Sequence, residues 1–348
     1  MNRYPQYRLL TDEGVRMAKK SNTKREFDWR SYTKPARLLS PEQEQSVAEG
    51  TLAPLLKVAH DRWDVRPEIR ARQLAFYCRG TMLLRVRGAD DALVGEIDAN
   101  VRVPRAERSG TEQLETWPLT TAEEVRAAAT ELSALCDLTA SFADPADVSE
   151  RAVLHAFADA NASGDGDLVV IDTEYQYGKR RFDFVAMRRA EGVAGPGGFA
   201  TPRLVVGQLK SAPRPLGGSS GLAPYVADFA DLARALGGSH IALAKAELAD
   251  LFAQKQRMGL APDDIELRHL TEDDPLYLVV LAGFFPGDPT LDVPLAEMHE
   301  KLVAKHYSPD LLRLSAVEDA RDQTQLHLGA DAFMTYREFK GYRKRLRG

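Results

Sequence analysis

The chain has 348 residues, 44% of them hydrophobic, and a formal net charge of −5 at pH 7. This length suits one large or two ordinary domains, and the apolar content is sufficient for packed cores. The mild acidity excludes a bulk polycation, so any contact with nucleic acid has to come from local patches.

The N-terminus and the cysteines favour a cytoplasmic protein without a membrane partner. The N-terminal sequence MNRYPQYRLL lacks the apolar segment of a secretory signal, and the chain contains no run of about 18 apolar residues that could span a membrane. Cys78 and Cys136 are far apart in the sequence and form no Cys-x-x-Cys motif. This usage suits a reducing compartment and argues against a disulfide scaffold.

Residues 1–140 are expected to form a separate N-terminal α+β domain. Two capping boxes, Ser40 to Gln43 and Thr121 to Glu124, predict one helix that reaches about residue 60 and another that starts at residue 122. Between them, alternating apolar residues predict two strands around a turn at residues 88–91. Nothing in this part of the sequence indicates its role.

Residues 145–305 are expected to form an α/β domain with a mixed central sheet flanked by helices. Asp144 and Pro145 suit the start of its first helix. The predicted elements are a helix from 145, strands over 168–177, 180–188 and 203–210, a helix over 225–236, a strand over 239–248, two strands within 264–285 and a helix near 291–306. The central order is therefore helix, three strands, helix and strand.

Polar side chains interrupt two of these apolar strands. Asp183 lies between Phe182 and Phe184, and Gln208 and Lys210 follow the apolar run 204–206. Residues two apart on a strand share a face, so Gln208 and Lys210 point the same way, and a hairpin across 189–202 would place Asp183 beside them. The carboxylate and the amide carbonyl suit a hard divalent cation, and the ammonium suits a water or a phosphate.

This arrangement resembles the PD-(D/E)xK nuclease superfamily, whose αβββαβ core is restriction-endonuclease-like. Asp183 matches the aspartate of the second core strand, and Gln208-Leu209-Lys210 matches the acid-x-Lys tripeptide of the third. Gln208 departs from the usual acid but is similar to the Gln-x-Lys of Mrr-type enzymes. At about 4 Å and an effective dielectric near 20, a unit charge pair is worth roughly 4 kcal/mol. We therefore expect a second acid.

Two glutamates are candidates for that acid. Glu150 lies on the apolar face of the first core helix, where the resemblance implies a metal-binding acid; otherwise it lies at the rim of that face. Glu174 lies in the first core strand, where a one-residue change of register would turn it to the solvent. The resemblance implies Mg²⁺ or Mn²⁺ bound by Asp183, Gln208 and one or both glutamates, with Lys210 positioning the attacking water.

Three further segments could contact a nucleic acid. Tyr225 begins the apolar stripe of the helix after Lys210 and either packs in the core or reaches a phosphate. Residues 306–348 are expected to form a helical tail that mixes aromatic and basic residues. Its candidate contacts are Arg337, Lys340, Arg343, Lys344 and Arg345. The basic arm 1–37 and this tail are each either nucleic-acid-binding or solvated.

Other catalytic classes lack support in the sequence. His299 and Glu300 are not followed by the second histidine of a zinc protease, and the chain has neither Gly-x-Ser-x-Gly nor Gly-x-Gly-x-x-Gly. The sequence therefore predicts a metal-dependent nuclease acting on DNA rather than RNA, and the resemblance implies bacterial antiviral defence or repair. One alternative is a nuclease-like protein that binds nucleic acid without cutting it. The other is a scaffold that binds a partner subunit or a second copy of itself.

Overall fold

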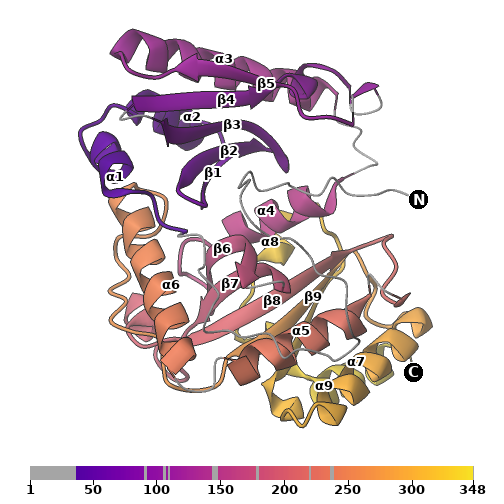
Figure 1. The fold of residues 1–348 in the computed structure, drawn as a ribbon. Helices are drawn as coiled ribbons and strands as arrows, with labels where there is room; N and C mark the ends of the chain where they lie inside the picture. Colours follow the sequence, from indigo (N-terminus) through magenta and orange to yellow (C-terminus); the bar gives the residue numbers. More distant parts are fainter. Residues whose placement is uncertain are drawn as a thin grey trace, which may run out of the picture.

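The computed structural model describes residues 37–89, 92–104, 107–108, 110–142, 148–177, 180–218, 221–235 and 239–347. The chain is a mixed α/β protein. Within the described residues the strands form two sheets, and helix α4 (Glu150–Ala160) lies between them (Figure 1). None of the described helices combines the length and the apolar character needed to cross a membrane. The basic arm 1–36 lies outside the described residues.

The first sheet is an antiparallel meander whose strands neighbour one another in chain order. Its strands are β1 (Val65–Arg70), β2 (Gln73–Cys78), β3 (Thr81–Ala89), β4 (Ala92–Asp98) and β5 (Leu114–Pro118), and the helices around it are α1 (Pro41–Ala48), α2 (Ala53–Asp61), η2 (Ala99–Arg102) and α3 (Ala122–Ser141). Val125, Leu132 and Leu135 recur at helical spacing on α3 and are buried. This apolar stripe is what holds α3 on the sheet.

The sequence predicted part of this arrangement. Both capping boxes are present. The single helix predicted up to residue 60 is instead α1 and α2, because Gly50 adopts a left-handed conformation (φ 81°) and ends α1. The predicted strand pair corresponds to β3 and β4, but β1 and β5 were not predicted. A turn at Arg79 and Gly80, both with positive φ, also separates β2 from β3.

A disulfide joins β2 to α3. Cys78 and Cys136 are bonded, with their Cα atoms 5.6 Å apart, and both side chains are buried. The expectation that these cysteines would not pair is therefore wrong. Their separation of 58 residues is closed by the meander, which brings α3 back against β2 and β3.

The second sheet is mixed, in the order β11-β10-β9-β8-β7-β6. Its strands are β6 (Leu168–Tyr177), β7 (Arg180–Arg188), β8 (Arg203–Ser211), β9 (Leu276–Ala282), β10 (Leu312–Val317) and β11 (Met334–Thr335). Strands β6 to β8 are antiparallel neighbours, β8, β9 and β10 run parallel, and β11 is antiparallel to β10. Around the sheet lie α4, η4 (Pro196–Phe199), α5 (Leu222–Ala235), α6 (Ser239–Arg257), η6 (Pro289–Leu291), α7 (Asp292–Ala304), η7 (Pro309–Leu311), α8 (Gln323–Leu326), η8 (Ala330–Ala332) and α9 (Tyr336–Arg347).

Helices α4 and α5 cover opposite faces of the second sheet. The register of β7, β8 and β9 places Phe184 and Tyr277 on opposite faces. Phe157 of α4 packs on Phe184, and Phe229 of α5 stacks on Tyr277, each pair with ring centroids 4.8 Å apart. Figure 1 shows α7 and α9 on the α5 side. The buried aromatic rings therefore fix which polar residues of the sheet face which helix.

Several elements differ from the sequence predictions. Residues 239–248, predicted as a strand, belong to helix α6, and the strand that lies beside β8 is β9. Residues 265–270 form no strand. The first helix begins at Glu150 with Ser149 as its N-cap, and the predicted start at Asp144 and Pro145 lies outside the described residues. Residues 306–348 contribute β10 and β11 to the sheet in addition to α9.

A buried group of charges connects the two sheets. We call it the interface cluster, and it consists of Arg37, Arg66, Glu68, Arg70, Asp172 and Lys255. Glu68 and Asp172 have no exposed surface. Asp172 of β6 pairs with Arg37 and with Arg70 of β1, and Lys255 of α6 donates to Glu68 at 2.8 Å. These bonds hold β1 against β6 and α6.

The cations of the interface cluster keep Glu68 ionised. Burial by itself raises the pKa of Glu68, but Lys255, Arg66 and Arg70 outweigh burial and hold this pKa well below its usual value. All carboxylate oxygens of Glu68 and Asp172 accept a hydrogen bond. The interface cluster is therefore a structural connection with no acceptor left over.

Candidate metal centre

The candidate centre begins with the pairing of β7 and β8. Phe184 lies directly opposite Gly207. Continuing this antiparallel register by one residue puts Asp183 opposite Gln208, and Lys210 follows on the same face of β8. A Cβ atom on Gly207 would lie 1.9 Å from the ring of Phe184, so only glycine fits there. This geometry agrees with the predicted hairpin.

Asp183, Gln208 and Lys210 share the sheet face that α5 covers. Lys210 points toward α5, because its Nζ lies 4.7 Å from the centroid of the Tyr225 ring. Gln208 and Lys210 are 2% and 6% exposed, which is rare for these residue types. Tyr225, a candidate for phosphate contact, therefore has a cation–π contact in the centre.

Helix α4 brings Glu150 to the end of β8. Ser149 caps the helix by accepting a hydrogen bond from Ala152 N at 3.1 Å, which fixes Glu150 at its first position. Glu150 Oε1 lies 3.6 Å from Lys210 Nζ, and its Oε2 lies 3.7 Å from Arg214 Nε. Glu150 is therefore a second acid beside the predicted tripeptide, in addition to Asp183.

The environment of Asp183 disfavours its charge. Burial raises its pKa to about 7, with smaller upward contributions from Glu150 and Glu174, although Lys210 and the backbone N–H of Leu209 act in the opposite direction. Leu209 N donates to Asp183 Oδ2 at 2.8 Å. An additional cation beside Asp183 would favour the carboxylate form.

Three buried oxygen atoms near Asp183 have no hydrogen-bond partner among the described residues: Glu150 Oε1, Gln208 Oε1 and Tyr277 Oη. Burial, followed by the charge of Asp183, raises the pKa of Tyr277 well above its usual value, so this hydroxyl stays protonated. Buried polar atoms are nearly always paired, and each exception needs a physical explanation. Two of these atoms are pure acceptors, so a cation or a water would complete them.

Glu174 has a different partner. Its carboxylate lies 2.6 Å from Arg151 NH2 and 2.8 Å from Arg151 Nε, in α4. The register of β6 and β7 places it across from Asp183, and its φ of 50° marks a local distortion of β6. Glu174 therefore adds negative charge near Asp183 while it is itself paired with Arg151.

The basic residues of α9 fall into two groups. Arg343 is 4% exposed and donates to Pro286 O and Asp288 O at 2.7 Å each. It fastens α9 to the loop that follows β9, so its side chain is not available to a nucleic acid. The four other candidates in this helix are exposed, and their side chains have no ion pair within the described residues: Arg337, Lys340, Lys344 and Arg345.

Tyr277 and Arg214 were not predicted from the sequence. Tyr277 is the one polar side chain in the apolar run LYLVVLA of β9, and that contrast is a usable signal. Arg214 follows Lys210 in a Pro-rich loop whose return to α4 no local pattern indicates.

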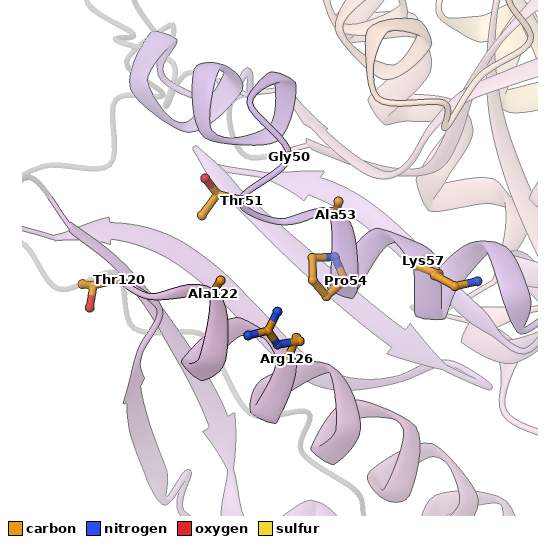
Figure 2. A pocket seen from close by; sticks show the side chains of 8 residues that line it. All are labelled: Gly50, Thr51, Ala53, Pro54, Lys57, Thr120, Ala122 and Arg126. Carbon is orange, nitrogen blue, oxygen red and sulfur yellow. The ribbon is translucent and has the colours of Figure 1, made fainter.

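Other locations in the described residues could also be considered as sites. Asp64, Cys78 and Cys136 are close enough to share a metal, but the two sulfur atoms are bonded to each other. A surface pocket of about 660 Å³ lies between the turn before α2 and the start of α3 (Figure 2). Its lining residues are Gly50, Thr51, Ala53, Pro54, Lys57, Thr120, Ala122 and Arg126. None of them belongs to the candidate centre.

Comparison with known proteins adds little to these observations. No protein-family model and no curated protein sequence matches the chain. One solved structure, that of Pyrococcus furiosus SfsA in complex with Ca²⁺, aligns over 72% of this chain and 86% of its own, with 10% identity and a TM-score of 0.22. A similarity this low assigns no fold and no function to the chain.

Proposed function

We propose that the chain is a Mg²⁺- or Mn²⁺-dependent phosphodiesterase that cleaves nucleic acid, with DNA as its substrate. The observation that carries the proposal is a pair of buried acceptors, Glu150 Oε1 and Gln208 Oε1, that accept no hydrogen bond from the described residues and lie beside Asp183 and Lys210. A set of oxygen ligands suits a hard divalent cation, and the buried ammonium suits a phosphate. Biologically, such an enzyme would fit bacterial DNA defence or repair.

The order of elements supports a restriction-endonuclease-like core. Helix α4, strands β6, β7 and β8, helix α5 and strand β9 follow one another as α-β-β-β-α-β, with α6 as an additional helix before β9. The parallel pairing of β8 and β9 makes the sheet mixed. In this core, Asp183 belongs to the second strand, and Gln208 and Lys210 belong to the third.

The residues have distinct roles in this proposal. Asp183, Gln208 and Glu150 hold the cation, and Glu174 adds negative charge from a greater distance. When bound, the cation lowers the pKa of a water and neutralises phosphate charge. Lys210 orients the water or stabilises charge on the phosphate. A water oxygen bonds to phosphorus, one ester P–O bond breaks, and a proton passes to the leaving oxygen.

Cleavage of nucleic acid tests the proposal directly. Plasmid, linear DNA and RNA are incubated with Mg²⁺, with Mn²⁺ or with EDTA, and the products are resolved by size. We expect cutting of DNA that EDTA abolishes. Absence of cutting with either metal would rule out the enzyme.

Substitutions in the centre separate metal binding from turnover. Asp183→Asn is expected to abolish both, since it removes the only acid on the second strand of the core. Lys210→Ala should keep metal affinity but reduce the rate on the order of 10²–10³-fold, because a preorganised charge is lost. Asp263→Asn and Lys57→Ala, both at exposed positions, are the controls. The rate is measured by plasmid nicking and Mn²⁺ affinity by calorimetry.

Gln208→Glu tests whether the amide carbonyl is a ligand. The variant keeps an oxygen and adds a charge, so Mn²⁺ affinity should be preserved or increased. The additional acid also raises the pKa of Asp183 in the metal-free protein, and the gain should therefore appear above pH 7. A loss of affinity at high pH would exclude Gln208 as a ligand.

The rival function is a nuclease-like protein that binds nucleic acid without cutting it. The observation that favours it is Gln208 at a position where an acid is usual, which leaves the centre with less negative charge. Salt-sensitive binding without cleavage, in the assays above, would select this function. Restored cutting by Gln208→Glu would identify Gln208 as the cause.

The exposed face of α9 is the proposed duplex contact. Replacing Arg337, Lys340, Lys344 and Arg345 by glutamine should weaken binding and flatten its salt dependence, because log K falls with log salt by about 0.9 per phosphate contact. Four exposed arginines elsewhere, Arg72, Arg126, Arg268 and Arg321, provide a charge-matched control. An unchanged slope in the α9 variant would make these residues a solvated helix face.

A further inference from the structure

Trp63 presents a large apolar indole ring to water. It lies in the turn between α2 and β1 and is 75% exposed, more than any other large apolar side chain among the described residues. An indole ring is usually largely buried, and a scattered exposed aliphatic residue is ordinary. An indole ring with an open face can stack on a nucleic-acid base.

One face of this ring has a cation. The guanidinium of Arg79 lies 5.7 Å from the centroid of the Trp63 ring. Neighbouring Arg62 is occupied by Asp64 and Asp137, at 3.1 and 2.8 Å, while Arg79 is 3.9 Å from Asp64 with its side chain 42% exposed. Arg79 therefore covers one face of the Trp63 ring. Of these two neighbouring arginines, only Arg79 offers an exposed guanidinium that no close ion pair occupies.

One turn of the first sheet links the Trp63 ring to the helix that supplies Glu150. Arg79 and Gly80 form the β2–β3 turn, and this turn lies against the first turn of α4. A Cβ atom on Gly80 would lie 2.7 Å from Ala152 N and 3.0 Å from Ser149 Oγ, so nothing larger than glycine fits. Ser149 and Ala152 lie on either side of Glu150 in the sequence, and Figure 1 shows α4 directly beside the first sheet. The β2–β3 turn thus contacts both the Trp63 ring, through Arg79, and the first turn of the helix that carries Glu150, through Gly80.

We propose that Trp63, backed by Arg79, is a stacking platform for an unpaired base of the nucleic-acid strand that enters the centre. This inference rests on the proposed function and assigns a role to the first sheet. Stacking needs the open face of a base, which a duplex hides, and one guanidinium cannot follow a duplex backbone. The platform therefore selects single-stranded segments.

Binding of single-stranded DNA in EDTA tests the platform without requiring cleavage. Trp63→Ala should weaken the affinity on the order of 5- to 150-fold, the range for loss of one stacked base. Trp63→Phe should recover most of the affinity, and Arg79→Gln should lose less than Trp63→Ala. Leu114→Ala, at an exposed apolar position on β5, is the control. Binding to a duplex without ends should change little in all variants.

Tryptophan fluorescence gives a second measurement. Stacking should quench the emission as oligonucleotide is added, and Trp63→Phe should lose this quenching even though Trp29 and Trp117 remain. If Trp63→Ala binds single strands as tightly as the parent, the platform is wrong and the nuclease proposal stands. If the parent binds no nucleic acid, both are wrong. Equal losses on single-stranded and duplex DNA would make Trp63 a general contact and overturn the selection of unpaired bases.

Discussion

The interface cluster and the candidate metal centre are both buried groups of charges, but they are incomplete in opposite ways. In the interface cluster, the carboxylates of Glu68 and Asp172 are fully bonded, and the atoms without partners in the described chain are donors, the Nε atoms of Arg37 and Arg70. In the centre, the atoms that make no hydrogen bond within the described residues include two acceptors, Gln208 Oε1 and Glu150 Oε1, and the latter has only its 3.6 Å ion pair with Lys210. A surplus of acceptors suits a cation, and a surplus of donors does not.

A structural charge group thus differs from a candidate functional one in its balance of charge. Burial alone does not separate them, because both lie in the interior. The distinction is whether the chain supplies enough opposite charge. Lys255, Arg66 and Arg70 hold the pKa of Glu68 far below its usual value, while burial holds the pKa of Asp183 up at about 7. The protein keeps Glu68 ionised by itself, whereas ionised Asp183 needs something more.

The largest change in the free energy of unfolding is expected for a substitution in the interface cluster. Asp172→Ala leaves buried Arg37 without its acid and Arg70 with Glu68 alone, and the free energy of unfolding should fall by roughly 3–5 kcal/mol. Urea unfolding followed by circular dichroism measures it, with Asp250→Ala at an exposed position as control. A change below about 1 kcal/mol would mean that water solvates these arginines and that the cluster is not a structural connection.

The next largest effect is the pH dependence of stability that Asp183 gives to the metal-free protein. Because burial raises its folded pKa above the unfolded value, the native state binds the extra proton, and ionisation of Asp183 lowers stability as the pH rises from about 4 to about 7. Asp183→Asn removes this dependence. The free energy of unfolding of the variant, relative to that of the parent, should therefore increase by up to about 1.4 kcal/mol per pH unit across that window.

Urea unfolding in EDTA at several pH values checks this prediction. Asp263→Asn, at an exposed position, should show no such trend. A stability difference between Asp183→Asn and the parent that is constant with pH would mean that Asp183 titrates normally and that the two charge groups are alike.

Packing rather than charge should hold the centre in place. Gly207→Ala pushes a methyl group into the ring of Phe184, so we expect a loss of about 1–3 kcal/mol in stability. The displaced β8 would also move Gln208 and Lys210, so cleavage and Mn²⁺ affinity should fall together. Normal activity in a stable Gly207→Ala protein would show that the centre tolerates a shift of β8.

The smallest effect is expected for a solvent-exposed pair. Lys57 and Asp61 on α2 are bonded at 2.7 Å but are 72% and 58% exposed. Lys57→Ala should change stability by about 0.2–1 kcal/mol, and salt should reduce the difference. Thermal unfolding at low and high ionic strength measures this. An effect as large as that of Asp172→Ala would mean that burial does not decide how strongly these charge pairs stabilise the fold.

The sequence revealed those parts of the centre that depend on local order. Asp183, Gln208 and Lys210 are placed by strand alternation and by a single hairpin, both visible as residue spacing. The predicted strand at 239–248 is wrong because Ala, Leu, Lys and Glu dominate this segment and favour a helix. The apolar residues that suggested a strand sit in α6.

The interface cluster could not have been predicted in the same way. Glu68 and Lys255 are 187 residues apart, and Arg37 and Asp172 are 135 apart. No periodic pattern connects such positions, because their meeting depends on how the two sheets pack. The pairing of Cys78 with Cys136 was missed for the same reason. In each case the composition of the segment is ordinary, and the contact is evident only from the tertiary arrangement.

The interface cluster also limits how this architecture can be recombined. Domains that meet through solvated polar contacts can be exchanged between chains as independent modules. Here, a replacement for the first sheet has to carry an acid at the place of Glu68 and a guanidinium at the place of Arg70, or Lys255 loses its acid and Asp172 loses one of its two arginines. Changes on the two sides are therefore expected to be strongly non-additive, and the two halves to diverge together rather than separately.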